Sequence, residues 1–230
     1  MKNSLSRTVD PLRVFNLRAS YELPLFPVDR AIPLEDPTNG LFKRSFDVLI
    51  SVIFTVCLFS WLLPIIAFII RLDSKGPVFF FQKRHKRNGE TFTCIKFRTM
   101  VINDSCDILA AVDNDPRITR VGRFLRKHHL DELPQLLNVL AGDMSMVGPR
   151  PYMIKDNEKY ENLIKHYGMR ERVKPGITGL AQVIEYVNPV TNIEYMEQRI
   201  KKDVYYVYNW SLALDVKILG RTLFKILRGK

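Results

Sequence analysis

The chain has 230 residues, a length that suits one domain with a small appendage. Its 35 lysine and arginine residues exceed its 24 aspartate and glutamate residues. The formal net charge of +11 points to an acidic partner: nucleic acid, a phosphorylated substrate or an anionic membrane. The three cysteines form no CxxC pair, and the four histidines add no metal-ligand spacing. These patterns argue against a disulfide framework and a structural zinc site.

The first stretch of the chain, residues 1–40, is polar and contains several prolines, with no sustained hydrophobic periodicity. Such a composition predicts a flexible or loosely docked extension. An arm that binds a partner protein is the alternative interpretation of the same composition.

An apolar run follows at residues 48–70, which contain no charged side chain. A helix needs about 20 such residues to cross a bilayer, and hydrophobicity on every face favours a membrane segment over a buried core helix. Pro64 predicts a kink, and Ser60, one turn earlier, is placed to bond a freed carbonyl. Basic residues, among them Lys43 and Arg71, flank both ends, so the positive-inside rule favours a re-entrant hairpin over a single span.

Downstream of this run, the pattern predicts a mixed fold in which helices predominate. Residues 78–82 and 91–97 have strand character, and the Asn-Gly turn signal at 88–89 joins them into an expected β-hairpin. Residues 117–127 and 212–230 each combine a basic stripe with an apolar stripe. Both suit helices at an anionic lipid surface, although solvated or packed surface helices have the same pattern.

Two adjacent carboxylates, Asp131 and Glu132, lie between stretches that are dense in basic residues. Leucines at helical spacing over residues 132–140 predict a short helix, with Asp131 as its N-cap and Gly142 as its stop. The pair then lies at the positive end of a helix dipole, a position that also favours phosphate.

Neighbours on a helix point about 100° apart, so Asp131 and Glu132 are not expected to share one proton. Separate roles follow: one carboxylate attacks phosphorus, and the other positions it or binds metal. Phosphoryl chemistry needs neutralising charge, and oxygen ligands suit Mg²⁺. In the alternative, Asp131 only caps a helix and Glu132 pairs with Arg126 or Lys127. The candidate counter-charges are Lys96, Arg98, Arg150 and Lys174.

The loop at residues 174–179 combines a lysine with Gly176 and Gly179. Such a loop brings backbone N–H groups toward phosphate oxygens. It lacks the pattern of a Walker loop, and a plain turn is the alternative.

A series of short segments, in a fixed order, covers most of the chain from about residue 43 to 228. The segments are KRSFD (43–47), SKGPVFF (74–80), KFRTM (96–100), DPRITRVG (115–122), LDELPQ (130–135), GDMS (142–145), GPRP (148–151), KPGITG (174–179) and DVYYV (203–207). Each is weak alone, but their number and order are specific. The chain therefore resembles the bacterial sugar transferases, in particular the small monotopic phosphoglycosyl transferases.

The resemblance implies transfer of a phospho-sugar from a UDP-sugar to undecaprenyl phosphate, with release of UMP. It also implies a ping-pong mechanism: Asp131 attacks the β-phosphate of the donor, and polyprenyl phosphate then attacks the phospho-sugar enzyme. Glu132 is implicated with Asp131 in binding Mg²⁺. The candidate substrate- or phosphate-binding residues are Lys96, Arg98, Arg126, Asp143, Arg150, Lys174, Gly176 and Thr178.

Three positions depart from the family pattern. The re-entrant helix of the family usually carries Ser-Pro, whereas Ser60 is followed by Trp61 and the proline is Pro64, which displaces the expected kink. The arginine of the RPGITG segment is Lys174, which keeps the charge but loses the two-point fork. The tryptophan often found after this segment is Leu180.

We therefore expect an α+β, mostly α fold: an extension over 1–40, a re-entrant membrane helix over 41–75, and a cytoplasmic catalytic domain with interfacial helices and a small hairpin over 76–230. Expected partners are a UDP-sugar, undecaprenyl phosphate and the phospholipid membrane, with downstream glycosyltransferases as further candidates. The expected location is the cytoplasmic face of the inner membrane, in a monotopic arrangement. No RNA or DNA motif is present, which argues against nucleic acid. A non-catalytic scaffold that binds anionic lipid is the alternative.

Overall fold

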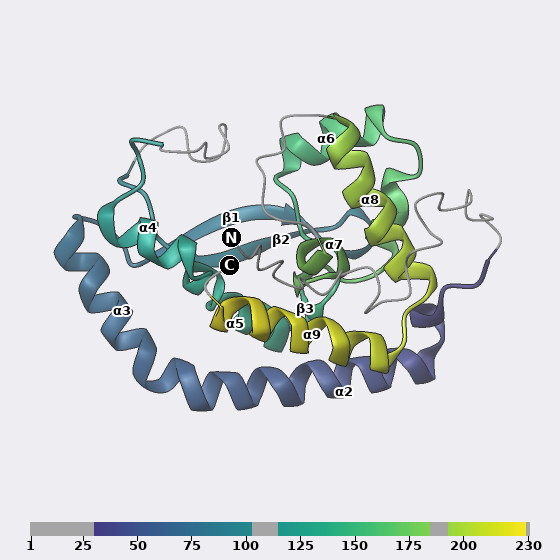
Figure 1. Cartoon of the computed structure of the whole chain (residues 1–230), viewed down its shortest axis with the longest axis horizontal. Helices are drawn as coiled ribbons and strands as arrows, with labels where there is room; N and C mark the ends of the chain where they lie inside the picture. The colour runs from purple at the N-terminus through teal and green to yellow at the C-terminus, as the bar shows by residue number, and fades with distance from the viewer. Residues whose placement is uncertain (1–29, 103–114, 185–192, 229–230) are drawn as a thin grey trace, which may run out of the picture.

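The computed structural model describes residues 30–102, 115–184 and 193–228 (Figure 1). Most of the expected N-terminal extension therefore lies outside the described residues. Within them the chain is mostly helical and carries two small two-stranded sheets, which confirms the predicted fold class.

The apolar run forms one long, bent helix along the lower edge of the molecule in Figure 1. It consists of α2 (Pro37–Phe54), the π-helical turn η3 (Thr55–Phe59) and α3 (Ser60–Asp73). The helix begins at Pro37 because the Asp36 carboxylate accepts two backbone N–H groups of the first turn, at 2.9 and 3.0 Å.

The bend lies at η3, where side chains bond carbonyls of the helix backbone. Ser60 Oγ donates to Val56 O and Trp61 Nε1 donates to Cys57 O, each at 2.7 Å. A π-helical turn bends a helix without interrupting it with a loop. Pro64 lies inside α3, so the bend precedes the proline and the chain stays helical through it.

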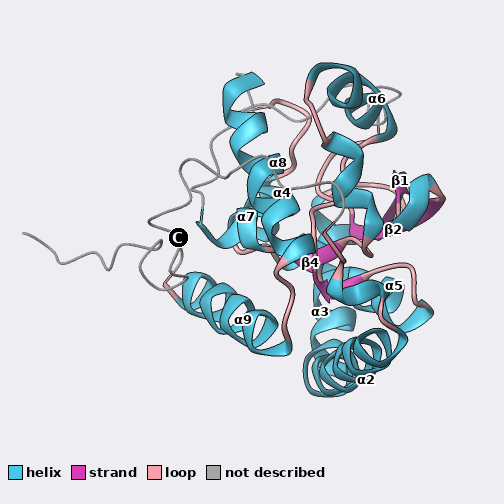
Figure 2. Cartoon of the chain, turned by 90° about the vertical axis from the view of Figure 1, so that its right-hand side faces the viewer, coloured by secondary structure: helices cyan, strands magenta, loops and turns pink. Residues whose placement is uncertain are grey.

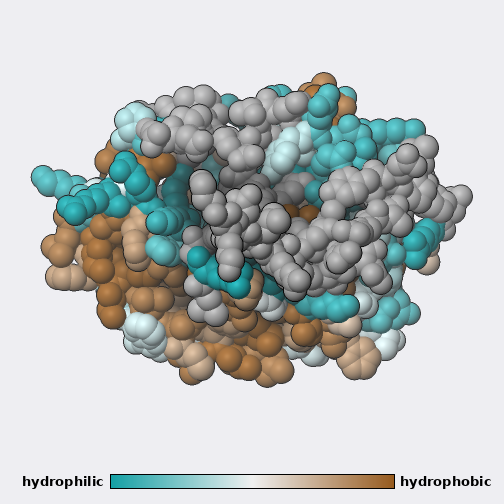
Figure 3. All heavy atoms as spheres, in the orientation of Figure 1, coloured by the Kyte–Doolittle hydropathy of each residue, from teal (hydrophilic) through white to brown (hydrophobic). Residues whose placement is uncertain are grey.

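The outward face of this helix is apolar and exposed, and it forms much of the brown band along the lower edge in Figure 3. Its exposed large side chains include Leu41, Phe42, Leu49, Val52, Ile53, Val56, Trp61, Ile65, Phe68, Ile69 and Leu72. By length and composition, Pro37–Asp73 is able to cross a membrane. The inward face packs on the protein through buried residues such as Ser51, Ile66 and Ile70.

The predicted β-hairpin is confirmed. β1 (Phe79–His85) pairs antiparallel with β2 (Thr91–Phe97). The turn depends on Asn88 and Gly89, which both have positive φ angles, of 61° and 74°. The strand β2 places Lys96 close to the carboxylate pair.

The second sheet was not predicted. β3 (Ser145–Val147) pairs in parallel with β4 (Gly176–Thr178). The two backbones meet so closely that a Cβ on Gly176 would lie 2.1 Å from Gly148 N. Gly176 therefore serves close backbone packing.

The other helices are α4 (Arg120–Lys127), α5 (Gln135–Ala141), α6 (Ile154–Leu163), α7 (Leu180–Ile184), α8 (Ile193–Tyr208) and α9 (Leu212–Leu227). The 3-10 turns are η2 (Pro33–Glu35), η4 (Arg87–Gly89), η5 (Leu130–Glu132) and η6 (Tyr167–Arg172). α4 and α9 confirm the two predicted basic, amphipathic helices. Gly142, with φ 91°, ends α5 as predicted.

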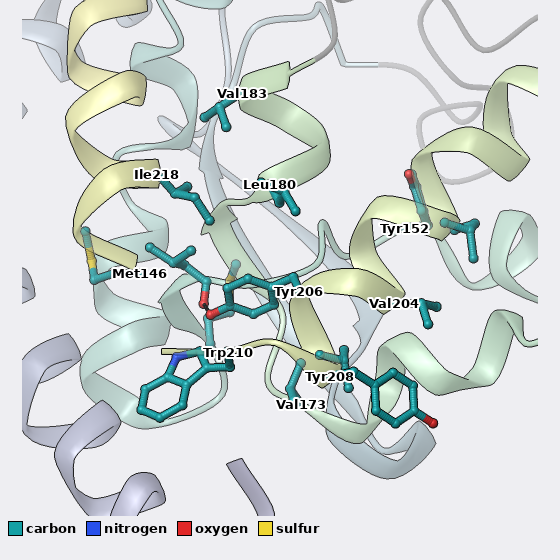
Figure 4. Packing of buried hydrophobic residues seen from close by; sticks show 14 of the residues in the cluster. Met146, Tyr152, Val173, Leu180, Val183, Val204, Tyr206, Tyr208, Trp210 and Ile218 are labelled. Carbon is teal, nitrogen blue, oxygen red and sulfur yellow. Dashed lines mark hydrogen bonds between the residues drawn. The ribbon is translucent and has the colours of Figure 1, made fainter. Parts of the chain in front are cut away.

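The main core gathers side chains from the small parallel sheet and the helices α7, α8 and α9 (Figure 4). A smaller cluster joins α3 to the hairpin and α4 through Ile66, Phe97 and Leu125, which are all buried. Figure 2 shows α9 and α2 along the lower side of the molecule, with α7 above α9 and α5 above α2.

A buried ion network connects α2 to α9. Lys43 Nζ lies 2.6 Å from Asp215 and 3.1 Å from Asp47. Tyr206 OH and Trp210 Nε1 donate to the same Asp215 carboxylate, at 2.8 and 3.1 Å. Because all these polar atoms have partners, the network fixes how the two helices lie relative to each other.

Candidate active site

The carboxylate pair lies in the 3-10 turn η5, which precedes α5. α5 begins at Gln135 with Pro134 as its N-cap, so the prediction that Asp131 caps this helix is wrong. Pro134 has no N–H to offer the Leu130 carbonyl, which instead accepts a tighter 3-10 bond at 3.2 Å. The proline therefore separates the pair from the helix.

Glu132 is held by two cations that are distant in the chain. Lys96 on β2 places Nζ 2.6 Å from Oε1, and Arg150 places its two terminal nitrogens 2.8 Å from Oε1 and 3.2 Å from Oε2. A two-point contact fixes both planar groups in one orientation. The alternative, in which Glu132 pairs with Arg126 or Lys127, is wrong.

These two cations control the charge of Glu132. Burial opposes ionisation of its carboxyl, but Arg150 and Lys96 outweigh burial and hold its pKa well below the usual range. In return, the charge of Glu132 raises the pKa of Arg150. Glu132 is therefore an anion at neutral pH, and the protein itself neutralises that charge.

Asp131 has a different environment from its neighbour. Its carboxylate has no hydrogen bond or ion pair with any residue that the structure describes. Burial and the charge of Glu132 raise its pKa, and the positive charges of Lys96, Arg126 and Arg150 offset this only in part. An unbound carboxylate of raised pKa is a better nucleophile, once ionised, than one held between two cations.

A cavity of about 590 Å³ lies beside the pair. Glu132, Arg150 and His129 belong to its lining, and so does Gln182, whose side-chain oxygen accepts from Arg150 at 3.4 Å. Most of the other lining residues are apolar and come from α2, α5, α7 and α9. Sequence reasoning missed Gln182, because only the packing of α7 brings it to Arg150.

A model of the family described as bacterial sugar transferase matches residues 38–229. The chain belongs to the bacterial sugar transferase family. A UDP-glucose:undecaprenyl-phosphate glucose-1-phosphate transferase from Klebsiella pneumoniae is 45% identical over 84% of this chain and 43% of its own length. A protein of the same name from Caulobacter vibrioides is 44% identical over 85% of this chain and 73% of its own.

A third relative is a UDP-N-acetylgalactosamine-undecaprenyl-phosphate N-acetylgalactosaminephosphotransferase from Aeromonas hydrophila. It is 41% identical over 85% of this chain and 46% of its own length. The chain therefore spans less than half the length of the Klebsiella and Aeromonas relatives.

Two further predicted site residues, Arg126 and Thr178, lie near the pair or the cavity. Arg126 Nε donates to Thr99 Oγ1 at 2.8 Å, and its charge acts on Asp131. The Thr178 hydroxyl lines the cavity and bonds that of Thr222 at 2.7 Å. Arg126 thus lies with Lys96 and Arg150 near Asp131, whereas Thr178 shares the cavity with Arg150.

Arg98 is directed elsewhere. Its guanidinium donates to the backbone carbonyls of Ser74, Lys75 and Pro77, at 2.8, 2.9 and 2.5 Å. These bonds hold the connection between α3 and β1. In this structure Arg98 therefore positions the end of the apolar helix and does not point at the carboxylate pair.

The remaining candidates form a second basic region. Asp143 accepts from Lys86 Nζ at 3.0 Å. Lys174 lies beside Arg44 in a separate, smaller cavity of about 80 Å³. Burial and the nearby charge of Arg44 lower the pKa of Lys174. Gly176 lies in the strand β4, between this region and the main cavity.

The residues at the pair fit one mode of Mg²⁺ binding. The described part of the chain contains no group of three or more Asp, Glu, His or Cys side chains arranged to hold a metal. Glu132 is already paired, so Asp131 is the carboxylate with open oxygens. Mg²⁺ often takes one or two carboxylates together with substrate phosphates, and these residues suit that arrangement and not an all-protein cage.

Proposed function

We propose that this protein transfers a sugar phosphate from a UDP-sugar to undecaprenyl phosphate and releases UMP. The observation that carries the proposal is the contrast within the pair: Asp131 is unbound and has a raised pKa, whereas Glu132 is clamped by Lys96 and Arg150. The names of the Klebsiella, Caulobacter and Aeromonas relatives describe this class of reaction and support the proposal.

In the proposed first step, an Asp131 carboxylate oxygen attacks the β-phosphorus of the UDP-sugar. A bond forms between that oxygen and phosphorus, and the bond from phosphorus to the bridging diphosphate oxygen breaks. UMP leaves with the electron pair, and the sugar phosphate remains on Asp131. In the second step, an oxygen of undecaprenyl phosphate attacks the same phosphorus and displaces Asp131, which regenerates the carboxylate.

The cations around the pair have a defined part in this scheme. Phosphoryl transfer is accelerated mainly by positioning and by neutralising charge on the transferred group. Lys96 and Arg150 are held by Glu132 at fixed positions beside Asp131. Asp131, with Glu132 beside it, would hold Mg²⁺ together with the diphosphate, and the ion would supply further neutralising charge.

The proposed location is the cytoplasmic face of the inner membrane, with the helix α2–η3–α3 as a re-entrant, monotopic anchor. Basic residues flank both ends of the apolar run, among them Lys43 and Arg71. The bend at η3 and the exposed apolar face of the helix support an element that enters and leaves the bilayer on one side. Such a position brings the pair to the surface where undecaprenyl phosphate resides.

The proposed donor is a UDP-linked hexose or N-acetylhexosamine, since the names of the relatives include both glucose and N-acetylgalactosamine. The product would be a lipid-linked sugar diphosphate that starts a surface polysaccharide. Downstream glycosyltransferases that extend such a product are the proposed functional partners.

The direct test is a panel of UDP-sugars with undecaprenyl phosphate and Mg²⁺, scored by UMP release. We expect turnover with at least one donor, loss of turnover in Asp131→Asn, and normal turnover in Glu158→Gln, a control on the exposed face of α6. Folded protein that releases no UMP with any donor would overturn the proposal and favour the non-catalytic lipid-binding scaffold.

A further inference from the structure

The cavity beside the carboxylate pair has the lining of a lipid site. Side chains of α2, α5, α7 and α9 form its walls, including Ile50, Phe54, Leu136, Leu219 and Leu223. Its volume of about 590 Å³ lies within the range of ligand pockets, and protein interiors rarely keep an apolar space of this size unfilled. The lining also includes polar side chains, among them Gln182, Arg199 and Lys225, but most of the exposed wall is apolar and suits a hydrocarbon chain better than a nucleotide.

The same cavity includes the charged groups of the reaction. Glu132 and Arg150 belong to its lining, and Arg150 is positioned to meet a phosphate beside Asp131. The cavity thus combines cationic recognition with an extended apolar wall. That combination complements an amphiphile with a phosphate head and a hydrocarbon chain.

The helices of two walls also carry exposed apolar side chains outside the cavity. Outside the cavity lining, α2 exposes Leu49 and Ile53, and α9 exposes Leu212 and Phe224. Because α2 and α9 lie on the same side of the molecule (Figure 2), a hydrocarbon chain that enters the cavity between them continues into apolar surroundings.

We infer that this cavity binds the isoprenoid chain of the acceptor over the units next to its phosphate. The inference rests on the proposed function and adds to it the place where the acceptor is held. An undecaprenyl chain is far longer than the cavity, so the remaining units extend along α2 and α9 into the bilayer. The phosphate then lies between Arg150 and Asp131, where the second step takes place.

Gly220 on α9 is a position at which a larger side chain can fill the cavity. It lines the cavity, and no atom lies within 4 Å of the position of an added Cβ. Gly220→Leu therefore fills the cavity without a backbone clash and replaces a weak helix former with a strong one. Ala213→Leu is the matched control, because it adds a similar apolar side chain to an exposed position of the same helix outside the cavity lining.

Kinetics with each variant separate acceptor binding from donor chemistry. We expect Gly220→Leu to raise the KM for undecaprenyl phosphate about tenfold, the scale on which a few methylene groups change fit in an apolar pocket. The KM for the UDP-sugar should match wild type, the Tm of Gly220→Leu should equal or exceed that of wild type because leucine is the better helix former, and Ala213→Leu should leave both KM values unchanged. An unchanged acceptor KM in Gly220→Leu, or equal changes in the two variants, would overturn the inference.

Photo-crosslinking identifies the occupant directly. A polyprenyl phosphate with a photoreactive group in its first isoprene units should label the cavity walls on α2 and α9, and unlabelled undecaprenyl phosphate should compete. Labelling confined to other surfaces would contradict the inference. So would labelling by a photoreactive phospholipid that undecaprenyl phosphate does not displace. If the proposed function itself is wrong, wild type will release no UMP from any donor, and this result is distinct from either labelling outcome.

Discussion

Glu132 and Arg150 form a two-point ion pair across 18 positions of sequence, with Arg150 nitrogens 2.8 Å from Oε1 and 3.2 Å from Oε2. Lys96 adds a third contact to Glu132, at 2.6 Å. Both cations are thereby fixed beside Asp131, which itself has no partner in the described part of the chain. In the proposed mechanism, Glu132 positions the two cations and Asp131 is the carboxylate that reacts.

Arg150→Lys tests the geometry of this pair. Lysine keeps the charge but offers no planar fork, so we expect kcat to fall by roughly 10- to 100-fold. Steady-state UMP release measures the effect. Arg123→Lys on the exposed face of α4 is the control and should retain wild-type kcat. Equal kcat for wild type and Arg150→Lys would show that the two-point contact has no part in the reaction.

Removing charge from each carboxylate should change stability in opposite directions. Glu132→Gln leaves Lys96 and Arg150 without their anion; because the Arg150 side chain is 36% exposed, we expect a loss of about 1–3 kcal/mol, less than for a fully buried ion pair. Asp131→Asn removes a carboxylate whose ionisation the site disfavours, so its stability should equal wild type or exceed it by up to about 1 kcal/mol.

Thermal or denaturant unfolding in the same detergent compares the two carboxylate variants. Both variants should lose activity although their stabilities differ, so the loss of activity is not explained by unfolding. A lower Tm in Asp131→Asn than in Glu132→Gln would contradict the assigned environments.

The pH dependence of activity and of stability follows from the opposite pKa shifts of Asp131 and Glu132. The pKa of Asp131 is raised, so its carboxylate takes up a proton at a higher pH than an ordinary aspartate, and kcat should fall as the pH drops through that value. Ionised Asp131 costs stability above its folded-state pKa, and that cost is relieved on acidification.

The pKa of Glu132 is lowered, so the stability it contributes is present above its unfolded-state pKa and is lost only as the pH falls through its lower, folded-state value. Acid inactivation should therefore be reversible and precede unfolding. Parallel profiles of activity and of circular dichroism against pH check this order, and coincident loss of both signals would refute it.

The buried network between α2 and α9 predicts a large structural effect. Lys43→Met leaves Asp47 and Asp215 without their cation, which should destabilise the protein by about 3–5 kcal/mol. Lys217→Met, at an exposed position of α9, is the control and should change stability by less than about 0.5 kcal/mol. Similar Tm values for the two variants would show that the network contributes little.

The close approach of Gly176 to Gly148 predicts that a larger residue at position 176 destabilises the protein. Gly176→Ala would place a methyl group 2.1 Å from Gly148 N and force β3 and β4 apart. A loss of about 1–3 kcal/mol is expected, the usual scale of overpacking. Gly168→Ala has its nearest neighbour at 4.0 Å and should be tolerated. Unfolding curves compare the two, and equal stability would contradict the close approach.

Local signals in the sequence predicted several elements correctly. The Asn-Gly turn, with positive φ at both residues, marked the hairpin, and Gly142 marked the end of α5. The assignment of Asp131 as a helix cap failed because Pro134 cannot donate the bond that would join η5 to α5. Elements that depend on one or two neighbouring residues could thus be predicted. Where two local signals conflict, as the N-cap signal of Asp131 and the proline at 134 do, the sequence did not show which one prevails.

Long-range features were beyond such reasoning. Lys96 and Arg150 were among the four candidate counter-charges, but no local rule shows that Glu132 is the carboxylate they bind. The strands β3 and β4 are each three residues long, too short to show a periodicity. The cavity depends on how α2, α5, α7 and α9 pack, which no single segment encodes.

The most direct test of the proposed mechanism measures whether Asp131 becomes covalently modified by the donor. The protein is mixed with a UDP-sugar that supports turnover and with Mg²⁺, in the absence of undecaprenyl phosphate, and its mass is measured intact and after proteolysis. We predict the added mass of one sugar phosphate on the peptide that contains Asp131, together with release of UMP, and neither in Asp131→Asn. Turnover that requires both substrates at once, with no adduct on trapped enzyme, would contradict a covalent role for Asp131.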